Sequence, residues 1–133
     1  MTRFRGRPEE VERRIKETAQ KDGRGVEIGL PQDPGAAGKS YSAYLVSQLA
    51  GWSVKVSTES GSKATRAAAV VSQVDAGNLT MLRAGWNLIL TNELRVFPAG
   101  RNDDQVDALS RAFLMLAGGS LPAQSMSIGW GAR

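Results

Sequence analysis

The residues best suited to catalysis or metal binding are the carboxylates of the segment Asn102 to Asp107. Asp103 and Asp107 are four positions apart and Asp104 and Asp107 are three apart, so all three can lie on one side of a helix. Like charges at this spacing repel one another, and a divalent cation would remove the repulsion. Capping is the competing explanation for Asp103 and Asp104, because acidic groups at a helix N-terminus complement the free N–H groups and the helix dipole.

The composition restricts the ligands that a metal site could use. The chain has no Cys and no His, which excludes thiolate and imidazole ligands and the commonest general base. Ligation by oxygen alone favours magnesium, manganese or calcium over zinc. The chain carries 17 Lys and Arg against 13 Asp and Glu, and its net charge of +4 suits a polyanionic partner without identifying one.

A second candidate is the segment from Asp33 to Ser40, between an expected strand and an expected helix. Its end, Gly38-Lys39-Ser40, is similar to a phosphate-binding loop. That motif requires Gly where this chain has Asp33, whose carboxylate would repel phosphate. A small ATP-binding protein built on this segment is therefore the weakest of our hypotheses, and a Gly-rich helix entry with an exposed Lys39 is the simpler explanation.

The elements that must position these residues alternate between helix and strand. Spacing, caps and breaker residues predict helices over 8–21, 38–49, 64–76, 86–96 and 103–116 and strands over 25–30, 52–57 and 79–82. Asp33 then lies just beyond the carboxyl end of a strand. On the last helix, the spacing of Phe113, Leu114 and Leu116 predicts core positions. We expect an α/β fold with a mainly parallel, short-stranded sheet flanked by helices, although three strands are few for an independent domain.

Several segments together resemble a known protein family. They occur in the family's order and are Leu30 to Lys39, Ser60 to Ala67, Gly85-Trp86-Asn87, Glu93-Leu94 and Phe97 to Ala108. They resemble the C-terminal nuclease domain of the large terminase subunit of tailed bacteriophages, and the string Phe-Pro-x-Gly-x-x-Asp-Asp-Gln-Val-Asp-Ala is the most specific of them. The resemblance implies a partial RNase H-like fold and a nuclease domain over residues 1–117. The Ser, Gly and Pro residues that follow predict a flexible tail over residues 118–133.

The resemblance also implies roles for individual residues. Asp33 matches the family's second acidic position and Asp104 matches the acidic position of the final helix, so these two are the expected catalytic residues. An Asp at the end of a strand and an Asp at the start of a later helix can hold a two-metal phosphodiester centre. The expected ligands of Mg²⁺ or Mn²⁺ are Asp33, Asp103, Asp104 and Asp107. Lys63 and Arg66 match a basic loop of the family, and together with Lys39 and Arg101 they are the expected contacts with double-stranded DNA.

Two departures from the family pattern bear on activity. Asn102 stands where members often have His, so an imidazole is absent there. The family's first catalytic Asp lies on an opening strand hairpin that precedes the residues resembling Thr2 to Arg5. We therefore expect a domain that lacks its opening strands, and the sequence leaves open whether it is a complete gene product or a truncated prophage copy. The missing strand would leave an exposed sheet edge, which predicts self-association or pairing with another polypeptide.

Three hypotheses follow from these observations. The first is a metal-dependent endonuclease domain of a phage DNA-packaging terminase, which hydrolyses phosphodiester bonds of double-stranded DNA and contacts other terminase or portal subunits. The second is a catalytically incomplete remnant that acts only in DNA binding or assembly. The third is the small ATP-binding protein. No apolar run is long enough to span a membrane and the first residues lack a signal-peptide pattern, so we expect the protein in the cytoplasm of the bacterial host.

Overall fold

The computed structural model describes residues 3–58 and 61–118, and the predicted tail lies outside them apart from Gly118. The elements are α1 (Pro8–Asp22), β1 (Ile28–Gln32), α2 (Ala36–Gln48), β2 (Val54–Thr58), α3 (Lys63–Asp75), α4 (Asn87–Val96) and α5 (Asp104–Gly118). The strands β1 and β2 are parallel, with Ile28 beside Val54 and Gln32 beside Thr58. The predicted α/β class and the parallel pairing are therefore confirmed.

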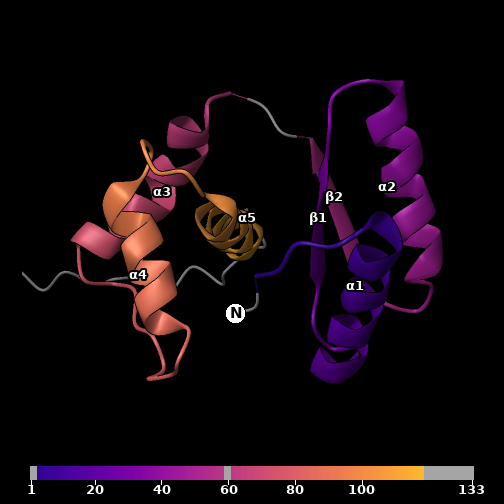
Figure 1. Ribbon diagram of the computed structural model, residues 1–133, viewed down its shortest axis with the longest axis horizontal. Helices are drawn as coiled ribbons and strands as arrows, with labels where there is room; N and C mark the ends of the chain where they lie inside the picture. Colours follow the sequence, from indigo (N-terminus) through magenta and orange to yellow (C-terminus); the bar gives the residue numbers. More distant parts are fainter. Residues whose placement is uncertain (1–2, 59–60, 119–133) are drawn as a thin grey trace, which may run out of the picture.

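The helices lie on both faces of the sheet (Figure 1). α1 and α2 cover one face, α5 faces the other, and α3 and α4 pack against α5 on its far side. The core beneath α1 and α2 consists of Ala19, Leu30, Leu45 and Leu49. Between α3, α4 and α5, the buried apolar side chains are Ala67, Val70, Leu90 and Val106. The sheet and α5 thus hold the chain's two groups of helices together.

Local signals account for the start of α3 and for both ends of α1. Ser62 caps α3, since its hydroxyl oxygen accepts a hydrogen bond of 3.1 Å from the backbone N–H of Thr65. At the other end of the chain, Glu10 of α1 accepts a bond of 2.8 Å from the backbone N–H of Arg7. Gly23 ends α1 with a φ of 85°, a backbone conformation that glycine adopts without strain. Short-range chemistry therefore sets where these two helices begin and where α1 ends.

The predicted strand over residues 79–82 is wrong. These residues form irregular structure, and Leu82 is 85% exposed. A short apolar run becomes a strand only where a neighbouring strand can pair with it, and residues 79–82 do not join the ladder of β1 and β2. The part of the chain that the structure describes therefore has a sheet of two strands rather than three.

The predicted core positions at the end of α5 are also wrong in part. Leu116 is 72% exposed and Leu114 is exposed as well, while Phe113 is half-buried. The buried residues of α5 are instead Gln105, Val106 and Ser110. The inward side of α5 is thus defined in its first two turns, where it includes polar side chains that hydrophobic spacing does not detect.

The outer edges of the sheet are relevant to partners. Among residues 3–58 and 61–118, the sheet consists of β1 and β2 alone, so each strand pairs on one side only. Unpaired strand edges bind further strands readily. Self-association through such an edge stays a prediction.

No helix in the described ranges is both long and apolar enough to cross a membrane.

Candidate nucleic-acid interface

A shallow hollow forms where the end of β1, the start of α3 and the first turns of α5 meet. Its lining residues are Pro31, Asp33, Gly61, Ser62, Lys63, Arg66, Asp104, Asp107, Ala108 and Arg111. The hollow therefore contains three carboxylates and three cationic side chains. Acidic and basic side chains that the sequence singled out in three separate segments therefore line the same hollow.

Asp33 enters the hollow from the sheet side. It directly follows Gln32, the last residue of β1, which confirms the predicted place at the end of a strand. The side chain is exposed, and its carboxylate makes no hydrogen bond or ion pair with the described part of the chain. The backbone of Asp33 lies against Gly38 in the first turn of α2, so this contact in the β1–α2 turn fixes the position of the Asp33 backbone from which the carboxylate extends. Asp33 is thus available to an incoming group.

The carboxylates of α5 are held by cations from α3. Lys63 Nζ donates a hydrogen bond of 2.6 Å to Asp103 Oδ2 and lies 3.7 Å from Asp107 Oδ2. Arg66 Nη2 donates a bond of 3.1 Å to Asp107 Oδ1, while its Nη1 donates to the carbonyl oxygen of Gly61. The repulsion expected among these aspartates is therefore relieved by side chains of the same protein.

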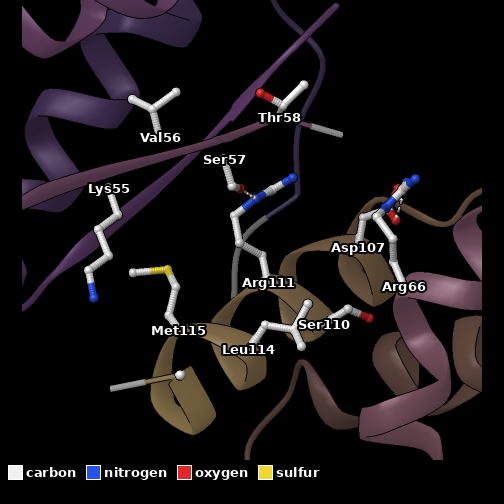
Figure 2. Close-up of a pocket in the computed structure, with 11 residues that line it drawn as sticks. Lys55, Val56, Ser57, Thr58, Arg66, Asp107, Ser110, Arg111, Leu114 and Met115 are labelled. Atoms are coloured by element: carbon white, nitrogen blue, oxygen red, sulfur yellow. Dashed lines mark hydrogen bonds and ion pairs between the residues drawn. The ribbon is translucent and has the colours of Figure 1, made fainter. Parts of the chain in front are cut away.

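A groove between β2 and α5 continues from the hollow (Figure 2). Arg66, Asp107 and Arg111 line both. Figure 2 shows Lys55 and Ser57 on the side of β2 that faces α5, and Arg111 Nε donates a bond of 3.4 Å to Ser57 Oγ. The hollow and the groove together form a polar track with cationic side chains at several points.

Glu93 is a buried carboxylate that belongs to one of the resembling segments but received no role in the sequence analysis. It lies on α4 and is only 5% exposed. Its Oε1 accepts hydrogen bonds from the backbone N–H groups of Gln105 (2.6 Å) and Val106 (3.1 Å), and its Oε2 accepts one of 2.8 Å from Gln105 Nε2. Glu93 therefore caps α5 from another helix. The available signal was a carboxylate three residues after Leu90, on the side of the helix where apolar residues are expected.

Arg3 links Glu93 to the hollow. Its Nη1 lies 3.9 Å from Glu93 Oε2 and its Nε lies 3.4 Å from Asp104 Oδ2. Each of the three aspartates of α5 and its N-terminal flank thus has a cationic neighbour.

The ion pairs of Lys63 give the protein a pH dependence that can be measured. The hydrogen bond to Asp103 raises the pKa of Lys63 above its ordinary value of 10.5. A raised pKa in the folded state means that the pair stabilises the protein fully below pH 10.5 and that this contribution is lost as the pH rises through the folded-state pKa. We expect the difference in unfolding free energy between the wild type and Lys63→Met to stay constant below pH 10.5 and to shrink as the pH rises above it, as followed by urea denaturation.

Tyr44 provides the control for that measurement. Its hydroxyl donates a hydrogen bond of 2.9 Å to Glu12, which raises the pKa of Tyr44 above 10.0, so the stabilisation from this bond is lost above pH 10.0, a range that includes the one expected for Lys63. Both the wild type and Lys63→Met contain Tyr44, so its contribution cancels when the unfolding free energy of Lys63→Met is subtracted from that of the wild type. The same subtraction is repeated in proteins that carry Tyr44→Phe. If the difference due to Lys63→Met then stays constant with pH, the Lys63 pairs do not contribute.

The structure brings together only some of the predicted site residues. Asp33, Asp104, Asp107, Lys63 and Arg66 line the hollow, and Asp103 is joined to it through Lys63. Lys39 in the first turn of α2 and Arg101 in the loop after α4 are exposed and do not line it. The capping explanation for Asp103 and Asp104 has a competitor, because Glu93 accepts the N–H groups at the start of α5. The catalytic, metal-binding and DNA-binding roles stay predictions.

The described residues do not fit a complete divalent-cation site. No group of three or more acidic side chains within residues 3–58 and 61–118 is placed to hold a metal ion. A hard cation such as Mg²⁺ requires several oxygen ligands, and Lys63 and Arg66 already occupy oxygens of Asp103 and Asp107. This arrangement therefore provides carboxylates without a finished metal centre.

Fold and site together define an α/β protein with a charged site at the carboxyl end of a parallel strand, the position where open α/β sheets bind their ligands. Residues 1–116 match the family model described as the terminase RNaseH-like domain, and the chain belongs to this family. The predicted family and its RNase H-like fold are thus confirmed, and with them a nuclease-type role in phage DNA packaging. Comparisons with curated proteins and with solved structures gave no match.

Proposed function

We propose that this chain acts in a packaging terminase as the nuclease domain that hydrolyses phosphodiester bonds of double-stranded DNA. Asp33 and Asp104 are the carboxylates that face the bond to be cut. The observation that carries the proposal is the hollow, where Asp33 from the end of β1 and Asp104 from the start of α5 meet beside Lys63 and Arg66. The family membership supports the same reaction class.

Contacts with DNA are expected along the hollow and its groove. Lys63, Arg66 and Arg111 line the hollow, and Lys55 lies further along the groove. A phosphate group would compete with the aspartates for these cations, so the affinity should fall steeply with salt and depend little on base sequence. The net charge of +4 favours such binding.

Cleavage requires more than the described residues supply. Mg²⁺ or Mn²⁺ is the cation that the family implies, and the carboxylates in the hollow do not complete its site. We therefore place hydrolysis in an assembly where a further oxygen ligand joins Asp33 and Asp104. Without that ligand the chain is expected to bind DNA and leave it intact. This second candidate, a catalytically incomplete DNA-binding or assembly piece, is favoured by the ion pairs of Lys63 and Arg66.

A plasmid-nicking assay with Mn²⁺ distinguishes these candidates. If the first is correct, supercoiled DNA is nicked when the chain is assayed in the assembly that supplies the further oxygen ligand, and Asp33→Ala and Asp104→Ala each abolish that nicking. Asp75→Ala is the matched control, because Asp75 is an exposed aspartate at the end of α3 that does not line the hollow. DNA binding that is lost at high salt, without nicking by any variant, would support the second candidate instead.

The partners follow from the same proposal. Double-stranded DNA is the substrate, and other terminase subunits or the portal are the proteins that a packaging nuclease would contact. An unpaired edge of the sheet of β1 and β2 is the proposed contact for such a protein or for a second copy. The proposed place of action is the cytoplasm of the bacterial host.

A further inference from the structure

Glu93 is unusual in its burial. Among the residues that the structure describes, it is the one charged side chain in the buried class. Burying a carboxylate is costly unless its oxygens are hydrogen-bonded. Both oxygens of Glu93 accept such bonds, and all three donors belong to Gln105 and Val106 in the first turn of α5.

We infer that Glu93 is the positioning residue that holds the carboxylates of α5 in place in the hollow. This inference rests on the proposed function, in which Asp104 faces the DNA. Glu93 itself does not line the hollow, and its side chain is too deeply buried to touch a ligand there. It acts through the backbone of α5.

The geometry explains how one carboxylate can orient two others. Asp104 and Asp107 flank the two residues, Gln105 and Val106, whose N–H groups Glu93 holds. The side chains of Gln105 and Val106 are buried on the inner side of the helix. Because successive helical residues are rotated by about 100°, positions three apart share a side, and the flanking aspartates point together into the hollow.

Arg3 adds a second link in the same direction. It lies within ion-pair distance of Glu93 and of Asp104, so it joins the buried carboxylate to the exposed one. Removing Glu93 would free the first turn of α5 and one neighbour of Arg3 at the same time. The expected result is a wider range of positions for Asp104 and Asp107.

Three substitutions, Glu93→Ala, Glu93→Gln and Glu93→Asp, separate the effect of the side chain's length from the effect of its charge. Glu93→Gln keeps an oxygen at the same distance and removes the charge. Glu93→Asp keeps the charge and shortens the side chain by one methylene. It replaces Glu93→Ala as the variant without the bonds to α5 if Glu93→Ala does not fold. Leu90→Ala is the matched control, because Leu90 is equally buried on α4 and makes no bond to α5's first turn.

The main readout is NMR, which does not depend on DNA. We expect amide hydrogen exchange at Gln105 and Val106 to accelerate by about tenfold or more in Glu93→Ala and Glu93→Asp relative to Leu90→Ala at matched global stability. The side-chain carboxyl ¹³C signals of Asp104 and Asp107 should move in the same two variants and stay near their wild-type positions in Glu93→Gln. Carboxyl signals that stay in place while amide exchange accelerates would overturn the inference, since Glu93 would then be a cap alone.

DNA affinity provides the second arm. Salt-dependent binding of a duplex should weaken in Glu93→Ala and Glu93→Asp more than in Leu90→Ala, and Glu93→Gln should restore it. Equal affinities in all four variants would contradict the inference. If the wild type itself does not bind DNA, the proposed function fails, and the NMR readout still decides whether Glu93 positions the two aspartates.

Discussion

Replacing Gly38 with Ala should destabilise the protein and displace Asp33, even though alanine is the better helix residue. A Cβ atom at position 38 would lie 2.8 Å from the carbonyl carbon and 2.9 Å from Cβ of Asp33, and closer still to its carbonyl oxygen. Alanine gains about 0.5–1 kcal/mol over glycine inside a helix. Overpacking against atoms that cannot rotate away costs about 1–3 kcal/mol or more, so the clash should win.

The matched control for this substitution is Gly25→Ala. Gly25 also lies outside the left-handed region, and a Cβ there would meet no atom within 4 Å. We expect its unfolding free energy in urea to change by no more than about 0.5 kcal/mol, while Gly38→Ala loses about 1–2 kcal/mol. A Gly38→Ala protein as stable as the wild type would mean that the β1–α2 turn can yield and does not fix Asp33.

Leu49→Ala should have the largest effect on stability, a loss of about 2–5 kcal/mol. Leu49 follows α2, is 2% exposed, and belongs to the core with Ala19, Leu30 and Leu45. Truncation removes the transfer energy of the side chain and leaves a cavity that helices packed on a two-stranded sheet can refill only in part. A domain of this size has only about 5–15 kcal/mol of total stability, so the loss is a large fraction of it.

Urea denaturation with Val46→Ala as the control tests this expectation. Val46 lies in the last turn of α2, three residues before Leu49, and is exposed, so truncating it should change the unfolding free energy by about 0.5 kcal/mol or less. A Leu49→Ala protein within that same range would show that the cluster under α1 and α2 is not the main core. The comparison also indicates how much a small sheet depends on its covering helices.

The hollow was predicted in part. Asp33 beyond a strand and Asp104 at the start of the final helix were expected from turn and cap residues, and the structure places both in one hollow. The strand over residues 79–82 was wrong, because an apolar run cannot show whether a pairing partner exists. Lys39 and Arg101 were expected to contact DNA, and both lie outside the hollow, since a basic side chain carries no sequence signal for its place in the fold.

The sequence by itself determined the five helices and the two paired strands to within a few residues, the position of Asp33 at a strand end and the family. These depend on signals within a few residues of one another, such as caps, breakers and apolar spacing, or on ordered motifs. Only the tertiary structure decided that Lys63 pairs with Asp103 and that Glu93 caps α5. Those contacts join residues 40 and 12 positions apart. Their partners are set by how the helices pack, which local patterns do not encode.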